Sequence, residues 1–187
     1  HTTQGNYPNR YPKGAVVPFT AGQCDREQDA IGTMNWGKTQ RYAFWSIGPT
    51  GKVYQTHTLD RWGHHAGTSS WPGLGEGLSN KLLGIEVVCA GKTDNDGKAW
   101  FGKVYRGERL RVGPTVDNCQ AGTYVKYTEA QEKALIDLLL WLKKNNPEEF
   151  SFDHVLGHDS IAPARKNDPG HSLSMTIPEL QAKLKSL

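Results

Sequence analysis

The segment Gly157–Gly170 holds the residues of this sequence that are best suited to chemistry. His158 follows a short apolar run, and Asp168 comes ten positions later in a loop that contains two prolines. Imidazole nitrogen and carboxylate oxygen both bind Zn²⁺ at about 2.0–2.2 Å, and a catalytic zinc keeps a coordination position open for water. Lys166 is close enough in sequence to face a developing oxyanion at the same ion. An ordinary turn, with Asp168 as a cap and Lys166 in solvent, is the alternative.

Glu86 is a second candidate because it interrupts the apolar run Lys81–Cys89. That run is typical of a strand buried on both faces. Burying a carboxylate as a charge costs free energy, so a functional acid with a raised pKa is expected here. The alternative is an edge strand whose glutamate points into solvent.

The 157–170 segment resembles the signature of type 2 N-acetylmuramoyl-L-alanine amidases, a superfamily that also contains peptidoglycan recognition proteins. In the similar branch a strand-end Gly-His is followed by an acidic residue, Ile, Pro, Arg-Lys and Asp-Pro-Gly. The matching residues here are His158, Pro163, Arg165, Lys166, Asp168, Pro169 and Gly170. The resemblance implies that His158 and Asp168 bind zinc and that Lys166 stabilises the oxyanion.

Two upstream motifs extend the resemblance. His64-His65-Ala66-Gly67 is similar to the family's His-Ala-Gly segment, which borders the substrate groove, so His65, Ala66 and Gly67 are expected to bind substrate together with Arg165. Gly84-Ile85-Glu86 resembles a Gly-Ile-Glu strand motif whose carboxylate points at the water to be activated. Some members use a hairpin tyrosine instead, but Ala43 falls at that position, which favours Glu86 as the base.

The third zinc ligand is assigned to His1. The family's first ligand is a histidine that ends the first strand, in an apolar-apolar-His-x-Thr context, and His1-Thr2-Thr3 matches the last part of that pattern. No strand is expected before it in this sequence. His57, His64 and His65 are the fallback ligands.

The pattern of elements predicts how these residues are positioned. Residues 1–19 are expected to form an irregular loop, followed by a short helix over Gln23–Ile31 and a hairpin of Arg41–Ile47 with Lys52–Thr58. Strands are expected at Lys81–Cys89, Ala99–Tyr105 and Phe152–Leu156. Helices should follow Thr128 and Thr176, which both begin capping-box patterns. Residues 90–126 have no clear counterpart in the family and are interpreted as an insertion near the groove.

These elements predict one α/β domain over residues 1–187, with a central mixed β-sheet flanked by helices, as in amidases and peptidoglycan recognition proteins. A net charge of +3 without clustered basic residues argues against nucleic-acid binding. No apolar run could span a membrane, and no signal peptide is visible. Three cysteines without a CxxC pair predict neither a disulfide scaffold nor a structural zinc site. A monomer is expected, and its localisation stays open.

The function implied by the resemblance is zinc-dependent hydrolysis of the amide between N-acetylmuramic acid and L-alanine in peptidoglycan. A non-catalytic peptidoglycan receptor on the same fold is the main alternative, and loss of a zinc ligand would be its mark. A copper monooxygenase that chelates copper through an N-terminal histidine is a further alternative, but it leaves the 157–170 segment unexplained.

Overall fold

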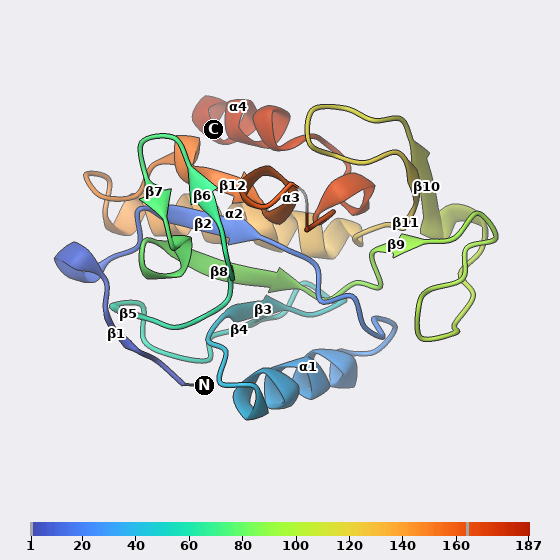
Figure 1. Cartoon of the computed structure of the whole chain (residues 1–187), viewed down its shortest axis with the longest axis horizontal. Coiled ribbons are helices and arrows are strands. Elements are labelled where there is room, and N and C mark those ends of the chain that lie inside the picture. Colours follow the sequence, from blue (N-terminus) through green and yellow to red (C-terminus); the bar gives the residue numbers. More distant parts are fainter. Residues whose placement is uncertain (1, 164) are drawn as a thin grey trace.

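A five-stranded mixed sheet forms the centre of the computed structural model, which describes residues 2–163 and 165–187 (Figure 1). The strands lie in the order β12 (Val155–Gly157), β2 (Gly14–Val17), β8 (Leu82–Val87), β3 (Trp45–Ile47) and β4 (Val53–Tyr54). The first four are parallel and β4 is antiparallel to β3. The expected α/β fold with a central mixed sheet is therefore confirmed.

Within the described residues, four α-helices surround this sheet: α1 (Glu27–Thr39), α2 (Glu129–Asn145), α3 (His158–Ile161) and α4 (Ile177–Ser186). Helix α2 lies behind the sheet, α4 covers the β12 side and α1 lies beside β3 (Figure 1). Short 3₁₀ segments occur at η1 (Pro8–Arg10), η2 (Leu78–Asn80), η3 (Gly107–Arg109), η4 (Phe152–His154) and η5 (Gly170–Ser172). Among the described residues, no helix combines the length and apolar character needed to cross a bilayer.

The two faces of the sheet are buried in different ways. Leu83, Ile85 and Val87 of β8 join the main core with the leucines of α2 and α4. Leu82 of the same strand packs on the other face in a smaller cluster that includes Val16. Because successive side chains of a strand point to opposite faces, Glu86 lies on the same face as Leu82. That face carries the candidate site.

The helices with complete N-terminal signals match their predictions. Thr128 caps α2 by accepting the N–H of Gln131 at 3.1 Å, and Thr176 caps α4 in the same way. The hairpin and the buried strand β8 are confirmed with shorter bounds, and the 3₁₀ segment η4 replaces the first part of the expected strand Phe152–Leu156. The first helix, expected at Gln23–Ile31, begins later: α1 spans Glu27–Thr39, and Asp29 accepts the Arg26 N–H at 3.0 Å where it begins.

The prediction of an irregular loop over residues 1–19 was wrong for Gly14–Val17. This segment is β2, a fully buried strand between β12 and β8. Four residues bounded closely by Pro12 and Pro18 are too few to show a periodicity, so the strand depends on pairing with neighbours that come much later in the chain. Upstream, β1 (Gly5–Asn6) pairs with β5 (Arg61–Trp62), and β6 (Ser70–Trp71) pairs with β7 (Gly75–Glu76).

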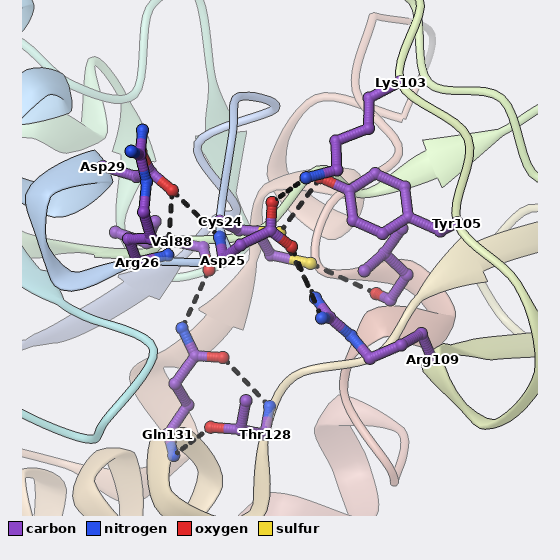
Figure 2. A network of polar contacts seen from close by, with 12 residues as sticks. Cys24, Asp25, Arg26, Asp29, Val88, Lys103, Tyr105, Arg109, Thr128 and Gln131 are labelled. Carbon is purple, nitrogen blue, oxygen red and sulfur yellow. Dashed lines mark hydrogen bonds and ion pairs between the residues drawn. The ribbon is translucent and has the colours of Figure 1, made fainter.

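The insertion forms a three-stranded antiparallel sheet of β10 (Leu110–Gly113), β11 (Gly122–Val125) and β9 (Lys92–Thr93). The expected strand Ala99–Tyr105 was wrong, because Gly97 and Gly102 adopt positive φ and fold this stretch into tight turns closed by a bridge between Lys98 and Val104. Lys103 and Arg109 both form ion pairs with Asp25, just before α1 (Figure 2). The insertion is therefore attached to the start of α1.

Candidate active site

His158 and Asp168 meet at the end of β12. His158 follows Gly157 directly, and the Asp159 N–H donates to the Asp168 carbonyl at 2.7 Å, which closes the loop between them. His158 Nδ1 lies 3.0 Å from Asp168 Oδ2, and the two side chains are only 4% and 5% exposed. The structure thus brings together the two ligands assigned to the 157–170 segment.

The tautomer of His158 makes this pair suited to a cation. His158 Nε2 lies 3.2 Å from the Ala66 carbonyl oxygen, which can only accept a hydrogen bond. Asp168 Oδ2 is likewise an acceptor, so both ring nitrogens face acceptor oxygens; when the single proton of a neutral imidazole is on Nε2 and is donated to Ala66, the lone pair of Nδ1 faces the carboxylate of Asp168. Two facing acceptors need a positive charge between them, which a proton or a metal ion can supply. His158 and Asp168 thus offer two donor atoms of the types that zinc binds.

The segment His64-His65-Ala66-Gly67 contacts His158 through the carbonyl oxygen of Ala66. Arg165 Nη2 donates to the carbonyl oxygens of Ala66 and Thr68 at 3.0 and 2.9 Å, so Ala66 is shared by His158 and Arg165. Ala66 itself is fully buried, which gives its carbonyl a positioning role. Gly67 adopts a φ of +59° and lies against Arg165, where a Cβ would be 3.0 Å from the guanidinium.

Gly84 explains how His65 reaches the sheet. A Cβ at Gly84 would lie 2.6 Å from Cγ of His65, so only glycine leaves room for the imidazole on this face. His65 Nε2 bonds the Leu82 carbonyl at 2.8 Å, and burial lowers the pKa of His65 to about 4. Glu86, two residues further along the strand, then lies open to the cavity.

Glu86 and Lys166 line one cavity with the His158–Asp168 pair. The cavity has a volume of about 640 Å³; its lining also includes His64, His65, Gly67 and Arg165. Burial raises the pKa of Glu86 to about 8; the charge of Asp168 adds to this effect and Lys166 opposes it. Glu86 Oε2 is inaccessible to solvent and has no hydrogen-bond partner among the described residues. A buried carboxylate in this state is poised to exchange a proton.

The third ligand is where the structure and the expected site differ. His1 lies outside the described residues. Within 2–163 and 165–187, no group of three or more His, Cys, Asp or Glu side chains is arranged to hold a metal ion. Of the fallback ligands, His64 and His65 line the cavity, whereas His57 does not.

Strand β2 shows what occupies the position beside His158. Val17 pairs with Gly157 and Val16 with Gly84, and a Phe19–Val87 bridge continues that register. Pro18 therefore lies between His158 and Glu86, with its ring on their face of the sheet. The segment 16–20 reads Val-Val-Pro-Phe-Thr, which is the apolar-apolar-x-x-Thr spacing of the family's first ligand with proline at the histidine position. Scanning for that spacing, rather than for a histidine, finds both the strand and the site.

The comparisons with known proteins agree with this geometry. Residues 8–171 match the family model described as N-acetylmuramoyl-L-alanine amidase. No curated protein matches the chain.

Three solved structures illustrate the similarity of fold. The amidase AmiD from E. coli, complexed with anhydro-N-acetylmuramic acid-L-Ala-D-γ-Glu-L-Lys, has a TM-score of 0.66 at 21% identity over 99% of this chain and 61% of its own. AmpDh3 from Pseudomonas aeruginosa, complexed with anhydromuramic pentapeptide, has a TM-score of 0.65 at 21% identity, over 99% of this chain and 64% of its own. A Drosophila peptidoglycan recognition protein, PGRP-SD, has a TM-score of 0.52 at 18% identity over 92% of this chain and 84% of its own. The chain thus spans less than two thirds of the first two proteins.

Proposed function

The chain belongs to the N-acetylmuramoyl-L-alanine amidase family, and we propose that it hydrolyses the amide between the lactyl group of N-acetylmuramic acid and L-alanine in peptidoglycan. The observation that carries this proposal is the buried pair of His158 Nδ1 and Asp168 Oδ2, which face one another at 3.0 Å in the cavity that Glu86 and Lys166 also line. Intact wall and soluble muropeptides both contain this bond. The whole of residues 1–187 is proposed as the catalytic domain, acting as a monomer.

Zinc is the proposed cofactor, held by His158, Asp168 and a third ligand for which His1 is the candidate. Bound zinc supplies Lewis-acid polarisation of an amide carbonyl and makes water more acidic. Two ligands leave the site incomplete, since a catalytic zinc has three protein ligands. The assignment of His1 is tested by zinc stoichiometry in His1→Ala.

The side chains of this cavity have separate roles in proton transfer and in stabilisation of charge. Glu86 accepts a proton from the attacking water and returns it to the leaving amine of L-alanine, as a general base and then a general acid. Lys166 stabilises the oxyanion of the tetrahedral intermediate, a contribution of about 3 kcal/mol for one well-placed donor. His65 and Gly67 border the substrate, and Arg165 holds the Ala66–Thr68 backbone against the site.

The deciding experiment is digestion of purified peptidoglycan with and without a chelator. The proposal expects new L-alanine amino termini that disappear when zinc is removed and return when zinc is restored. New reducing sugar ends without new amino termini would instead identify a glycosidase. Tight copper in place of zinc would favour oxidative chemistry.

Pro18 favours a second candidate, a peptidoglycan receptor that binds without cutting. Proline carries no donor atom for a metal, so the position between His158 and Glu86 contributes nothing to coordination. A receptor would retain wall fragments in a pull-down and release no L-alanine termini even in excess zinc. Release of those termini by the wild-type chain excludes this candidate.

A further inference from the structure

A second groove of about 590 Å³ adjoins the catalytic cavity along α1. Its lining residues are Thr20, Ala21, Gly22, Gln23, Gln28, Asp29, Gly32, Thr33, Trp36 and Trp100. Four of them, Thr20, Ala21, Thr33 and Trp36, also line the catalytic cavity. The two hollows therefore form one continuous surface, with the His158–Asp168 pair at one end.

One wall of this groove is a single face of α1. Gln28, Gly32 and Trp36 follow one another at intervals of four, which places them in a row along the helix. A Cβ added at Gly32 would meet nothing within 4 Å, so the floor of the groove is open there. Trp36 is 56% exposed and packs against Tyr42 with ring centroids 5.7 Å apart. Its ring is thus held in place at the junction of the two hollows.

The opposite wall comes from the insertion. Trp100 is 79% exposed, yet its indole N–H donates to the Ala21 carbonyl at 2.6 Å, which fixes the ring across the groove. The ion pairs of Lys103 and Arg109 with Asp25 hold the same turn against the start of α1 (Figure 2). Side chains that are ordered before binding lose little conformational entropy when a ligand arrives.

The charges along the surface indicate which part of peptidoglycan each end accepts. Asp29 is the charged side chain of the groove among its described lining residues, and its carboxylate already accepts the N–H groups of Asp25 and Arg26. The Asp29 side chain is only 8% exposed and pairs with Arg26, and the described lining of this end presents no cationic side chain to the carboxylates of a stem peptide. Arg165 and Lys166 at the catalytic end would attract those carboxylates. An uncharged sugar fits flat aromatic faces bordered by amides and hydroxyls.

We propose that the groove between Trp36 and Trp100 binds the glycan of peptidoglycan, a β-1,4-linked chain of N-acetylhexosamines, so that the lactyl amide reaches the catalytic cavity. This inference rests on the proposed function for its substrate but not on catalysis, because a receptor would use the same groove. Trp36 and Trp100 are substrate-binding residues in this arrangement. The insertion that carries Trp100 thereby contributes to recognition.

The test is binding of the β-1,4-linked tetramer of N-acetylglucosamine, followed by quenching of tryptophan fluorescence and by calorimetry. Trp100→Ala and Trp36→Ala are expected to weaken binding by at least about tenfold. Trp141→Ala is the matched control, because Trp141 is 47% exposed on α2 and packs against Trp45 away from the groove. The control should bind the tetramer as the wild type does.

A second variant fills the groove without removing an aromatic ring. Gly32→Leu should block binding, and leucine favours a helix over glycine, so the fold is retained. Gly32→Ala adds only a methyl group and separates the effect of volume from that of helix propensity. Its affinity should lie much closer to the wild type than to Gly32→Leu.

These measurements separate failure of the groove from failure of the proposed function. If the wild-type chain binds the tetramer but does not cut peptidoglycan, the proposal of a glycan-binding groove stands and the proposed amidase activity is wrong. The proposal of a glycan-binding groove is overturned by any of three results. The tetramer does not bind, Trp36→Ala and Trp100→Ala bind the tetramer as the wild type does, or the free stem peptide binds in this groove instead.

Discussion

Two neighbouring strands of the central sheet end side by side, and they differ in the residue that comes directly after each strand. Strand β12 is followed by His158, which faces Asp168, whereas β2 is followed by Pro18. The strands are parallel and in register, with Val17 opposite Gly157. The backbone therefore presents two adjacent positions in one row with Glu86, and only the position at the end of β12 carries a side-chain donor atom.

This contrast shows that the fold and the coordination chemistry are specified separately. Register and burial of β2 are satisfied by Gly14–Val17 whichever residue comes next. Coordination depends on one side chain at the strand end, which contributes little to the core. A chain can thus keep the sheet, the cavity and Glu86 while one ligand position changes.

Removing the carboxylate that faces His158 at the end of β12 should have the largest effect. Asp168→Ala is expected to abolish zinc binding and to lower amidase activity by more than about a hundredfold, since disturbing even the partners of metal ligands costs 10- to 100-fold. Metal analysis and release of L-alanine termini measure the two losses. Asp137→Ala, an exposed carboxylate on α2, should change neither. Wild-type zinc content in Asp168→Ala would contradict the ligand assignment.

Glu86 lies on the other side of Pro18 and tests the proton chemistry separately from the metal. Glu86→Gln keeps the shape of the side chain and should retain bound zinc, while turnover falls by about 10²- to 10⁴-fold through loss of the general base. Single-turnover release of L-alanine termini measures the change. Full activity in this variant would remove Glu86 from the mechanism.

The sharpest test of the comparison places a histidine directly after β2, as His158 follows β12. Pro18→His should tighten zinc binding by at least about tenfold, because a third ligand completes a catalytic site. Competition with a fluorescent chelator measures the affinity, and Pro18→Ala is the control for loss of proline. If His1 already supplies the third ligand, His1→Ala weakens zinc binding in the wild type and has less effect in Pro18→His.

The smallest effect concerns stability as a function of pH. Burial raises the pKa of Glu86 from 4.5 to about 8, so the folded chain holds a proton that the unfolded chain has lost between those values. The free energy of unfolding should therefore fall as pH rises from about 4.5 to 8. Urea titrations should show a steeper decline in the wild type than in Glu86→Gln, because Asp159, whose pKa is also raised, is present in both. Identical pH dependence in both would contradict the raised pKa.

The sequence predicted the parts of the fold whose signals are local. Thr128 with Gln131 and Thr176 with Glu179 are capping signals that lie within one turn, and both helices begin where these residues indicate. Residues Gly157–Gly170 also act within one loop, which explains why His158 and Asp168 could be paired before their distance was known.

The missed features depend on contacts between distant segments. Strand β2 has four residues, and its place is decided by β8 and β12 rather than by its own pattern. His1 matches the local His-x-Thr pattern, whereas the position beside His158 is defined by the pairing of β2 with β12 and holds Pro18. Trp36 and Trp100 come from separate elements, and no local pattern in the sequence indicates that they flank one groove.

The turn that carries Trp100 has a further consequence for engineering. Because Lys98 and Val104 are bridged, residues 99–103 leave and rejoin the insertion at neighbouring points. Such a tip can be exchanged for another of equal length while Lys103 is kept for its pairing with Asp25. The tip is in this sense a cassette. A library of its sequences offers a way to redirect the chain towards differently modified bacterial walls without touching the catalytic cavity.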